Sequence, residues 1–210
     1  MTTTAKPVIL ESGDRLTREE FHRRYELRPD IRKAELIGGT VFVMASPLRT
    51  SVHGAPHGLV VMWLQTYAGK TPGVQFSLEG TVYLDDDAEV QPDALLFWLP
   101  LRGTRARLDE KGYIVGAPDL IVEVAASSAS YDLHAKKDAY RRAGVPEYIV
   151  WRVLDEQIDW FRLRGGEYVR VEPDAAGMIE SEVFPGLRLA VDSMLAGDVA
   201  GVLAAIGVRL

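Results

Sequence analysis

The chain has 210 residues, is 47% hydrophobic and 26% charged, and carries a formal net charge of −6 at pH 7. This length and composition suit one domain with a sizeable core, and they exclude disordered, collagen-like and coiled-coil proteins. Cysteine is absent, which excludes disulfides and zinc–thiolate sites and favours a cytoplasmic protein. The acidic balance argues weakly against a general nucleic-acid coat, although positive charge can still be local.

Residues 1–13 are expected to form a flexible arm, and residues 14–210 a single domain. The segment Met1–Lys6 lacks the apolar centre of a signal peptide. No apolar run reaches the length needed to span a membrane. We therefore expect no membrane association.

The first ordered elements are predicted to be a helix and a hairpin. Thr17 and Glu20 have the spacing of a capping box, which predicts a helix over 17–28. Gly38 and Gly39 separate two apolar runs, and such a pair is typical of a hairpin turn. The predicted hairpin strands are 34–37 and 40–44.

The remaining elements follow from apolar periodicity and from turn residues. Pro56 opens a helix that runs to Tyr67, and Gly69 ends it. Asp132 is a plausible N-cap for a second helix over 133–143. A terminal helix is expected near 192–205, and an exposed loop at 100–113. Short apolar or alternating runs predict strands at 74–78, 82–84, 93–99, 120–124, 147–153, 157–163, 167–171 and 178–181.

Glu123 is the first residue that points to chemistry, because it interrupts the apolar strand 120–124. Such a strand is expected to be buried on both faces. A buried carboxylate must be paired, protonated or bound to a metal, since leaving it uncompensated costs several kcal/mol. A structural ion pair with an arginine is an equal alternative at this point.

Asp93 and Asp119 each follow a proline at the start of a predicted strand. A proline is tolerated at the first position of a strand. Either aspartate could place a carboxylate next to Glu123, and either could be an ordinary turn residue. The spacing alone does not choose between them.

Lys136 lies in the middle of the apolar side of the predicted helix 133–143. Lys137 lies toward the edge of that side, and Asp138 lies opposite. A lysine on the inward face needs a carboxylate, a phosphate or water at its ammonium group. The alternative is a side chain that extends to the rim of the core.

Two carboxylates and a lysine make a coherent set for phosphodiester hydrolysis. Carboxylates on neighbouring strands can hold Mg²⁺, which prefers oxygen ligands. The cation polarises a phosphoryl oxygen and lowers the pKa of a bound water. A nearby lysine can orient or deprotonate that water, or neutralise charge on the phosphate.

The sequence resembles the Uma2 (DUF820) family of endonuclease-like proteins with the PD-(D/E)xK nuclease fold. The similarity extends from about residue 17 to the C-terminal helix, and the block 118–148 is the most specific part. The matching motifs are Glu35-Leu36-Ile37 with Gly39, Pro92-Asp93, Pro118 to Val124 with Ser127-Ser128, Asp132, Lys136, Tyr140, Gly144 to Tyr148, and Phe184 to Leu187.

The resemblance implies an α/β (α+β) fold with a restriction-endonuclease-like αβββαβ core. This core has a mixed sheet, preceded by the N-terminal helix and hairpin and followed by extra C-terminal strands. The resemblance also implies that Asp93, Glu123 and the backbone carbonyl of Val124 bind Mg²⁺ or Mn²⁺. Asp93, Glu123 and Lys136 would be the catalytic residues.

The sequence departs from the family pattern at three positions. The plain form of the motif has a lysine two residues after the acidic residue, where this chain has Ala125. The lysine is instead expected on the following helix, as Lys136. The aspartate of the family hairpin is replaced by Gly38, and the aspartate that ends the strand 147–153 is replaced by Arg152.

Three further residues are accessory candidates. Glu35 either approaches the metal from the hairpin or makes a cross-strand ion pair. His57 matches a histidine common in the family and could touch a phosphate, and Tyr140 belongs to the matched motif. His53 lies four residues before His57, but Gly54 and Pro56 argue against a single helical face, so this pair is not predicted to bind metal.

The leading hypothesis is a Mg²⁺-dependent endonuclease that acts on DNA, and the alternative is a nuclease-fold protein used for binding or assembly. A third hypothesis is cleavage of a phosphodiester other than DNA. The candidate phosphate anchors are Arg102, Arg105 and Arg141, although a solvated surface is the simpler reading of each. A homodimer or higher homo-oligomer is expected, because cutting two strands commonly uses two sites.

Overall fold

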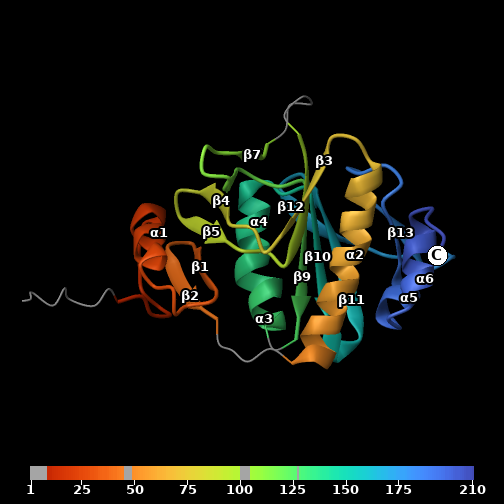
Figure 1. The fold of residues 1–210 in the computed structure, drawn as a ribbon, viewed down its shortest axis with the longest axis horizontal. Coiled ribbons are helices and arrows are strands. Elements are labelled where there is room, and N and C mark those ends of the chain that lie inside the picture. Colours follow the sequence, from red (N-terminus) through yellow and green to blue (C-terminus); the bar gives the residue numbers. More distant parts are fainter. Residues whose placement is uncertain (1–8, 45–48, 100–104, 127) are drawn as a thin grey trace, which may run out of the picture.

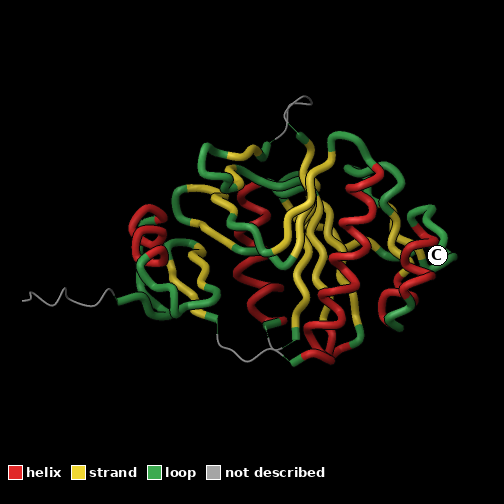
Figure 2. The backbone as a smooth tube through the Cα atoms, in the orientation of Figure 1, coloured by secondary structure: helices red, strands yellow, loops and turns green. Residues whose placement is uncertain are grey.

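A computed structural model describes residues 9–44, 49–99, 105–126 and 128–210. Figure 1 shows the order of the elements, and Figure 2 shows helices on both sides of a central group of strands. The strands form two six-stranded sheets and one two-stranded sheet. None of the helices in the described ranges is long and apolar enough to cross a membrane.

The central sheet carries the site. Its strand order is β12-β11-β10-β9-β6-β3. The strands β9 and β10 are parallel, and the other neighbours are antiparallel. The bounds are β3 Val74–Leu78, β6 Ala94–Trp98, β9 Leu120–Ala125, β10 Glu147–Arg152, β11 Gln157–Arg164 and β12 Glu167–Val171. All six residues of β9 are buried, which confirms the predicted central strand.

The two faces of this sheet are covered by different helices, because successive side chains of a strand point to opposite faces. Val122 and Val124 pack with α2 (Ala55–Lys70), whereas Ile121 and Ala125 pack with the helical segment 129–143. That segment consists of α3 (Ala129–Tyr131), a π-helical stretch (Asp132–Lys136) and α4 (Lys137–Ala143). Glu123 therefore belongs to the face covered by 129–143.

The second sheet has the order β2-β1-β5-β4-β8-β7. Its strands are β1 Ala34–Ile37, β2 Thr40–Val43, β4 Val82–Asp85, β5 Ala88–Val90, β7 Arg107–Leu108 and β8 Ile114–Val115. The predicted helix and hairpin are confirmed: α1 (Arg18–Glu26) begins after its N-cap Thr17 and packs Phe21 against the hairpin. The predicted strand 82–84 belongs to this second sheet and not to the central sheet, because β4 pairs with β5 and β8.

The order α2-β3-β6-β9-(129–143)-β10 reproduces the αβββαβ core that the resemblance implies. The C-terminal part adds the hairpin β13 (Met178–Glu180) and β14 (Arg188–Ala190), followed by α5 (Val191–Leu195) and α6 (Val199–Ala205). The single terminal helix predicted for 192–205 is therefore two helices. They separate at Gly197, whose φ of +70° is incompatible with a continuing helix.

Four local expectations are corrected. Leu10 is 3% exposed and the amide of Gly13 donates to Val41, so the described part of the expected arm is fixed on the hairpin. Asp132 lies inside the helical segment and is buried, and therefore it is no N-cap. A π-helical stretch, Thr50–Gly54, leads directly into α2, so Gly54 does not interrupt the helix.

The capping box at the start of α1 is only half formed. The hydroxyl of Thr17 accepts a hydrogen bond from the amide of Glu20, but the carboxylate of Glu20 pairs with arginines of the same helix and does not bond back to Thr17.

Candidate active site

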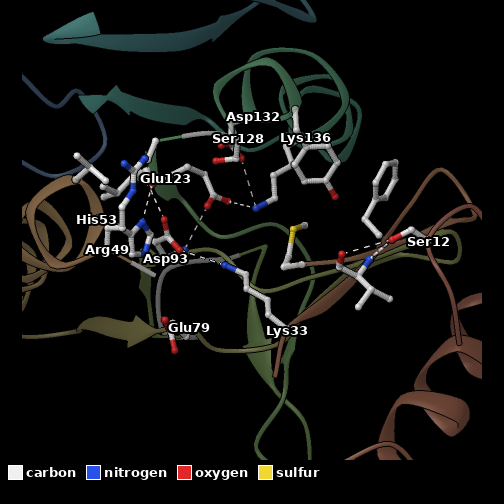
Figure 3. Close-up of a pocket in the computed structure, with 17 residues that line it drawn as sticks. Ser12, Lys33, Arg49, His53, Glu79, Asp93, Glu123, Ser128, Asp132 and Lys136 are labelled. Atoms are coloured by element: carbon white, nitrogen blue, oxygen red, sulfur yellow. Dashed lines mark hydrogen bonds and ion pairs between the residues drawn. The ribbon is translucent and has the colours of Figure 1, made fainter. Parts of the chain in front are cut away.

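A cavity of about 560 Å³ opens beside the start of β6 and the end of β9. Asp93, Glu123, Val124 and Lys136 all contribute to its wall, as Figure 3 shows for the labelled side chains. The cavity also receives residues from the hairpin and from the segment before α2. It is therefore formed where the two large sheets meet the helical segment 129–143 and the segment before α2.

Asp93 and Glu123 are neighbours because β6 and β9 are antiparallel and Ala94 pairs with Val122. Oδ2 of Asp93 accepts a 2.8 Å hydrogen bond from the amide of Val124, and the amide of Asp93 donates to Oε2 of Glu123 over 3.4 Å. Asp93 is 5% exposed and Glu123 is 2% exposed. The two carboxylates thus share one buried wall of the cavity.

Asp119, the alternative to Asp93, has a different role. Its Oδ2 accepts a 3.0 Å hydrogen bond from the amide of Trp98, at the far end of β6 from Asp93. This contact ties the start of β9 to the end of the neighbouring strand. The geometry therefore selects Asp93 over Asp119 as the partner of Glu123.

Lys136 reaches Glu123 from the π-helical stretch. Its Nζ lies 2.7 Å from Oε1 of Glu123, 3.1 Å from Oε1 of Glu35 and 3.7 Å from Oδ1 of Asp132. The side chain is 2% exposed, so it does not extend to the rim. The predicted inward orientation of Lys136 is what the structure shows.

Glu35 and Tyr140 hold this ion pair in place. The phenol of Tyr140 donates a 2.8 Å hydrogen bond to Oε1 of Glu123. Oε1 of Glu35 accepts from the amide of Gln91 at 2.8 Å, and its Oε2 accepts from the phenol of Tyr131 at 3.4 Å. Lys136 is thus the ion-pair partner of both Glu35 and Glu123, and within the described residues no arginine pairs with Glu123.

Lys33, Asp132 and Arg49 are part of the site that sequence reasoning missed. Nζ of Lys33 lies 3.1 Å from Oδ1 of Asp93. A signal for Lys33 existed, because it precedes Glu35 by two residues and alternate residues of an extended chain share a face. Arg49 lines the cavity from the segment before α2, and no local pattern marks it.

Two histidines of the helical segment 50–70 touch backbone carbonyls of the site. Nδ1 of His53 lies 3.1 Å from the carbonyl oxygen of Val124, and Nε2 of His57 lies 3.0 Å from that of Asp93. Their rings are 5.3 Å apart. The expectation that Gly54 and Pro56 would separate them is wrong, since the helix is continuous.

Two of the three predicted arginine anchors, Arg105 and Arg141, are not brought to this cavity. Arg102 lies outside the described residues. Arg105 is exposed and donates to the carbonyl of Gly144, and Arg141 is held by Asp138 and the carbonyl of Gly166. Both guanidinium groups thus contact residues that do not line the cavity, and the cationic groups at the cavity besides Lys136 are Lys33 and Arg49.

Burial and mutual repulsion perturb the carboxylates. Burial raises the pKa of Glu123 to about 8, aided by Asp93 and Asp132 and opposed by Lys136. Burial also opposes the charge of Lys136, but Glu123 and Glu35 outweigh it and raise the pKa of Lys136 well above its usual value. For Asp93, Lys33 and Lys136 overcome burial and lower the pKa. Lys136 is consequently an ammonium group in this state.

The cluster has more acidic than basic groups. Two ammonium groups, those of Lys33 and Lys136, face four buried carboxylates, those of Glu35, Asp93, Glu123 and Asp132. Buried charge without a partner is costly. Such an excess is balanced either by protons or by a cation with oxygen ligands.

The family model described as "Putative restriction endonuclease", Uma2, matches residues 18–192. The chain belongs to the Uma2 family. The family assignment expected from the sequence motifs is thereby confirmed. No curated protein in the comparison matches the chain.

A solved structure supports the fold of this Uma2 protein. A crystal structure described as a putative nuclease belonging to DUF820, from Anabaena variabilis ATCC 29413, superposes with a TM-score of 0.60. The sequences are 18% identical, and the match covers 78% of this chain and 90% of the other. At this identity the likeness concerns the fold, and it confirms the expected nuclease-type α+β architecture.

Proposed function

We propose that this Uma2 protein is an endonuclease that hydrolyses phosphodiester bonds of DNA with the help of Mg²⁺ or Mn²⁺. The observation that carries the proposal is the placement of three side chains. Asp93 and Glu123 lie on one buried wall of an open cavity, and the ammonium group of Lys136 is 2.7 Å from Glu123. Membership of a family described by restriction-endonuclease character supports the same reaction class.

The residues present suit a divalent cation. Asp93, Glu123 and the carbonyl of Val124 would hold it, and the excess of buried carboxylates supplies the negative charge. When bound, such an ion polarises a phosphoryl oxygen and lowers the pKa of a water ligand. His53 now contacts the Val124 carbonyl, so its ring would turn away from that oxygen or share it.

Lys136 is assigned an electrostatic role. Because Glu123 and Glu35 keep its pKa high, it stays an ammonium group at neutral pH, donates hydrogen bonds, and neither gives up nor accepts a proton. An ammonium group at this position can orient a water molecule and offset negative charge that develops on the phosphate. This role is narrower than the acid–base alternatives that the sequence left open.

The cationic side chains at the cavity would anchor the backbone of the nucleic acid. Lys33 and Arg49 both line the cavity, and phosphate oxygens are good partners for an ammonium and for a guanidinium group. Lys33, Arg49 and a bound divalent cation would together supply local positive charge for a polyanionic substrate, although the net charge of the chain is −6. The expected homo-oligomer stays a prediction, which sedimentation velocity would test.

The proposal is tested with supercoiled plasmid in Mg²⁺ or Mn²⁺. We expect nicking by the native chain and its loss in Asp93→Asn, Glu123→Gln and Lys136→Met. The matched control is Lys137→Met, because Lys137 is the adjacent lysine and lies over the ring of Phe161 instead of the cavity. Equal nicking by all variants would overturn the proposal. Cation binding without any cleavage would instead identify a nuclease-fold binding module.

A further inference from the structure

A second group of metal-ligand side chains meets beside Asp93. One ring nitrogen of His57, one carboxylate oxygen of Glu79 and one of Asp93 lie within 4.8 Å of one another. In Figure 3, Glu79 and Glu123 lie on opposite sides of Asp93. The group is therefore distinct from the pair Asp93–Glu123, although it shares one residue with it.

Three separate elements bring this group together. His57 comes from α2, Glu79 from the turn after β3, and Asp93 from the residue before β6. Glu79 adopts a φ of +50°, which is uncommon for a residue with a side chain, and its amide contacts the carbonyl of Asp93 over 3.4 Å. His57 contacts the same carbonyl at 3.0 Å. The ring of His57 and the backbone of Glu79 are thus both tied to the carbonyl of Asp93.

The donor set differs in kind from that of the first site. One imidazole and two carboxylates suit manganese, zinc and related ions better than Mg²⁺, which prefers oxygen ligands and retains water. Ligand atoms bound to one such ion are separated by at most about 4.4 Å, given bond lengths of about 2.2 Å. The observed limit of 4.8 Å exceeds this by a few tenths of an ångström, a difference that movement of the exposed Glu79 side chain can close.

We propose that His57, Glu79 and Asp93 form a second divalent-cation site, of the manganese or zinc class, which shares Asp93 with the Asp93–Glu123 site. Asp93 would then lie between the two cations. The inference concerns binding alone, and it rests on the proposed function only through this shared carboxylate.

The test uses Mn²⁺ as the probe, with binding stoichiometry from calorimetry and pulsed electron paramagnetic resonance to detect nitrogen ligands. The native chain should bind about two ions, and about one of them should be lost in His57→Ala and in Glu79→Gln. Nitrogen coupling should disappear in His57→Ala and persist in His53→Ala, which controls for the neighbouring ring. Glu172→Gln, an exposed acid away from the cavity, should bind like the native chain.

Unchanged stoichiometry in Glu79→Gln or unchanged nitrogen coupling in His57→Ala would overturn the proposal. A native chain that binds manganese without nitrogen coupling would also overturn it. Glu79→Gln decides the case if His57→Ala does not fold, because Glu79 is exposed. Glu123→Gln separates the two proposals: it should keep the nitrogen-coupled ion and lose the other, whatever the outcome of the plasmid assay.

Discussion

Nζ of Lys136 lies 2.7 Å from Oε1 of Glu123 and reaches it from a helix instead of from the strand that carries the carboxylate. The plain nuclease motif would place this lysine at position 125, where the chain has a buried alanine. The π-helical stretch Asp132–Lys136 directs both of its charged ends inward. The ammonium group therefore reaches Glu123 from the helical segment that covers β9, and not from β9 itself.

The first prediction concerns the stability of this ion pair. Lys136→Met leaves Glu123 and Glu35 buried without their ammonium partner, so we expect a loss of roughly 3–5 kcal/mol in the free energy of unfolding. The double variant Lys136→Met/Glu123→Gln should recover part of this loss, because it removes a buried charge. Urea denaturation without added metal, at a pH above 8 where Glu123 is ionised, measures all three proteins. Strictly additive effects would contradict the coupling.

The second prediction concerns the pH dependence of metal binding. Burial raises the pKa of Glu123 to about 8, so the metal-free protein holds a proton at neutral pH that a cation must displace. Displacement becomes easier as pH rises, and Mg²⁺ affinity should therefore increase from about pH 6 to about pH 8 and then level off. Calorimetry in buffers of different ionisation enthalpy measures the released proton.

The raised pKa of Glu123 also makes the stability of the metal-free protein depend on pH, in the opposite direction to the metal affinity. Because the folded-state pKa of Glu123 exceeds its usual value of 4.5, the folded state binds the proton more tightly than the unfolded chain does. The free energy of unfolding of the metal-free protein should then fall as pH rises from 4.5 to about 8. Glu123→Gln should remove both pH dependences. An affinity independent of pH in the native chain would refute the assignment.

The elements of the core could be predicted because their signals are local. The apolar run around Glu123, the inward face that holds Lys136 and the paired glycines of the hairpin are all visible in short windows of sequence. These local patterns predicted Glu123 and Lys136 directly. Asp93 needed the family resemblance, because its local pattern is the same as that of Asp119.

The missed features depend on contacts between distant segments. Lys33 meets Asp93 only because the hairpin sheet folds against the central sheet, sixty positions apart in the chain. Asp132 resembles an N-cap in sequence, but the helix extends three residues further back, to Ala129, and buries it. Arg105 and Arg141 were plausible anchors by charge alone, and their partners on the outer side of α4 could not be read from composition.

The third prediction concerns the phenol that supports Glu123. Tyr140→Phe removes a 2.8 Å hydrogen bond to Oε1 of Glu123 and should cost about 1 kcal/mol of stability. It should also change the Mg²⁺ affinity, because the carboxylate is held less firmly. Tyr148→Phe is the matched control: that phenol is equally buried but donates to the carbonyl of Asp132. If both variants change the calorimetric affinity alike, Tyr140 has only a packing role.

The last prediction separates two effects of Lys33. Its ammonium group lies 3.1 Å from Oδ1 of Asp93, and Asp93 raises its pKa against the opposing effect of burial. Because it competes with a cation for this carboxylate, Lys33→Met should tighten Mn²⁺ binding by about tenfold, equivalent to about 1.4 kcal/mol. As a phosphate anchor it should also be needed for plasmid nicking, so the same variant should cut more slowly while it binds metal more tightly.

The control is Lys111→Met, a change in the β7–β8 turn, which should alter neither the manganese affinity nor the rate of nicking. Weaker manganese binding in Lys33→Met would show that the lysine organises Asp93 for the cation, and the competition argument would then be wrong.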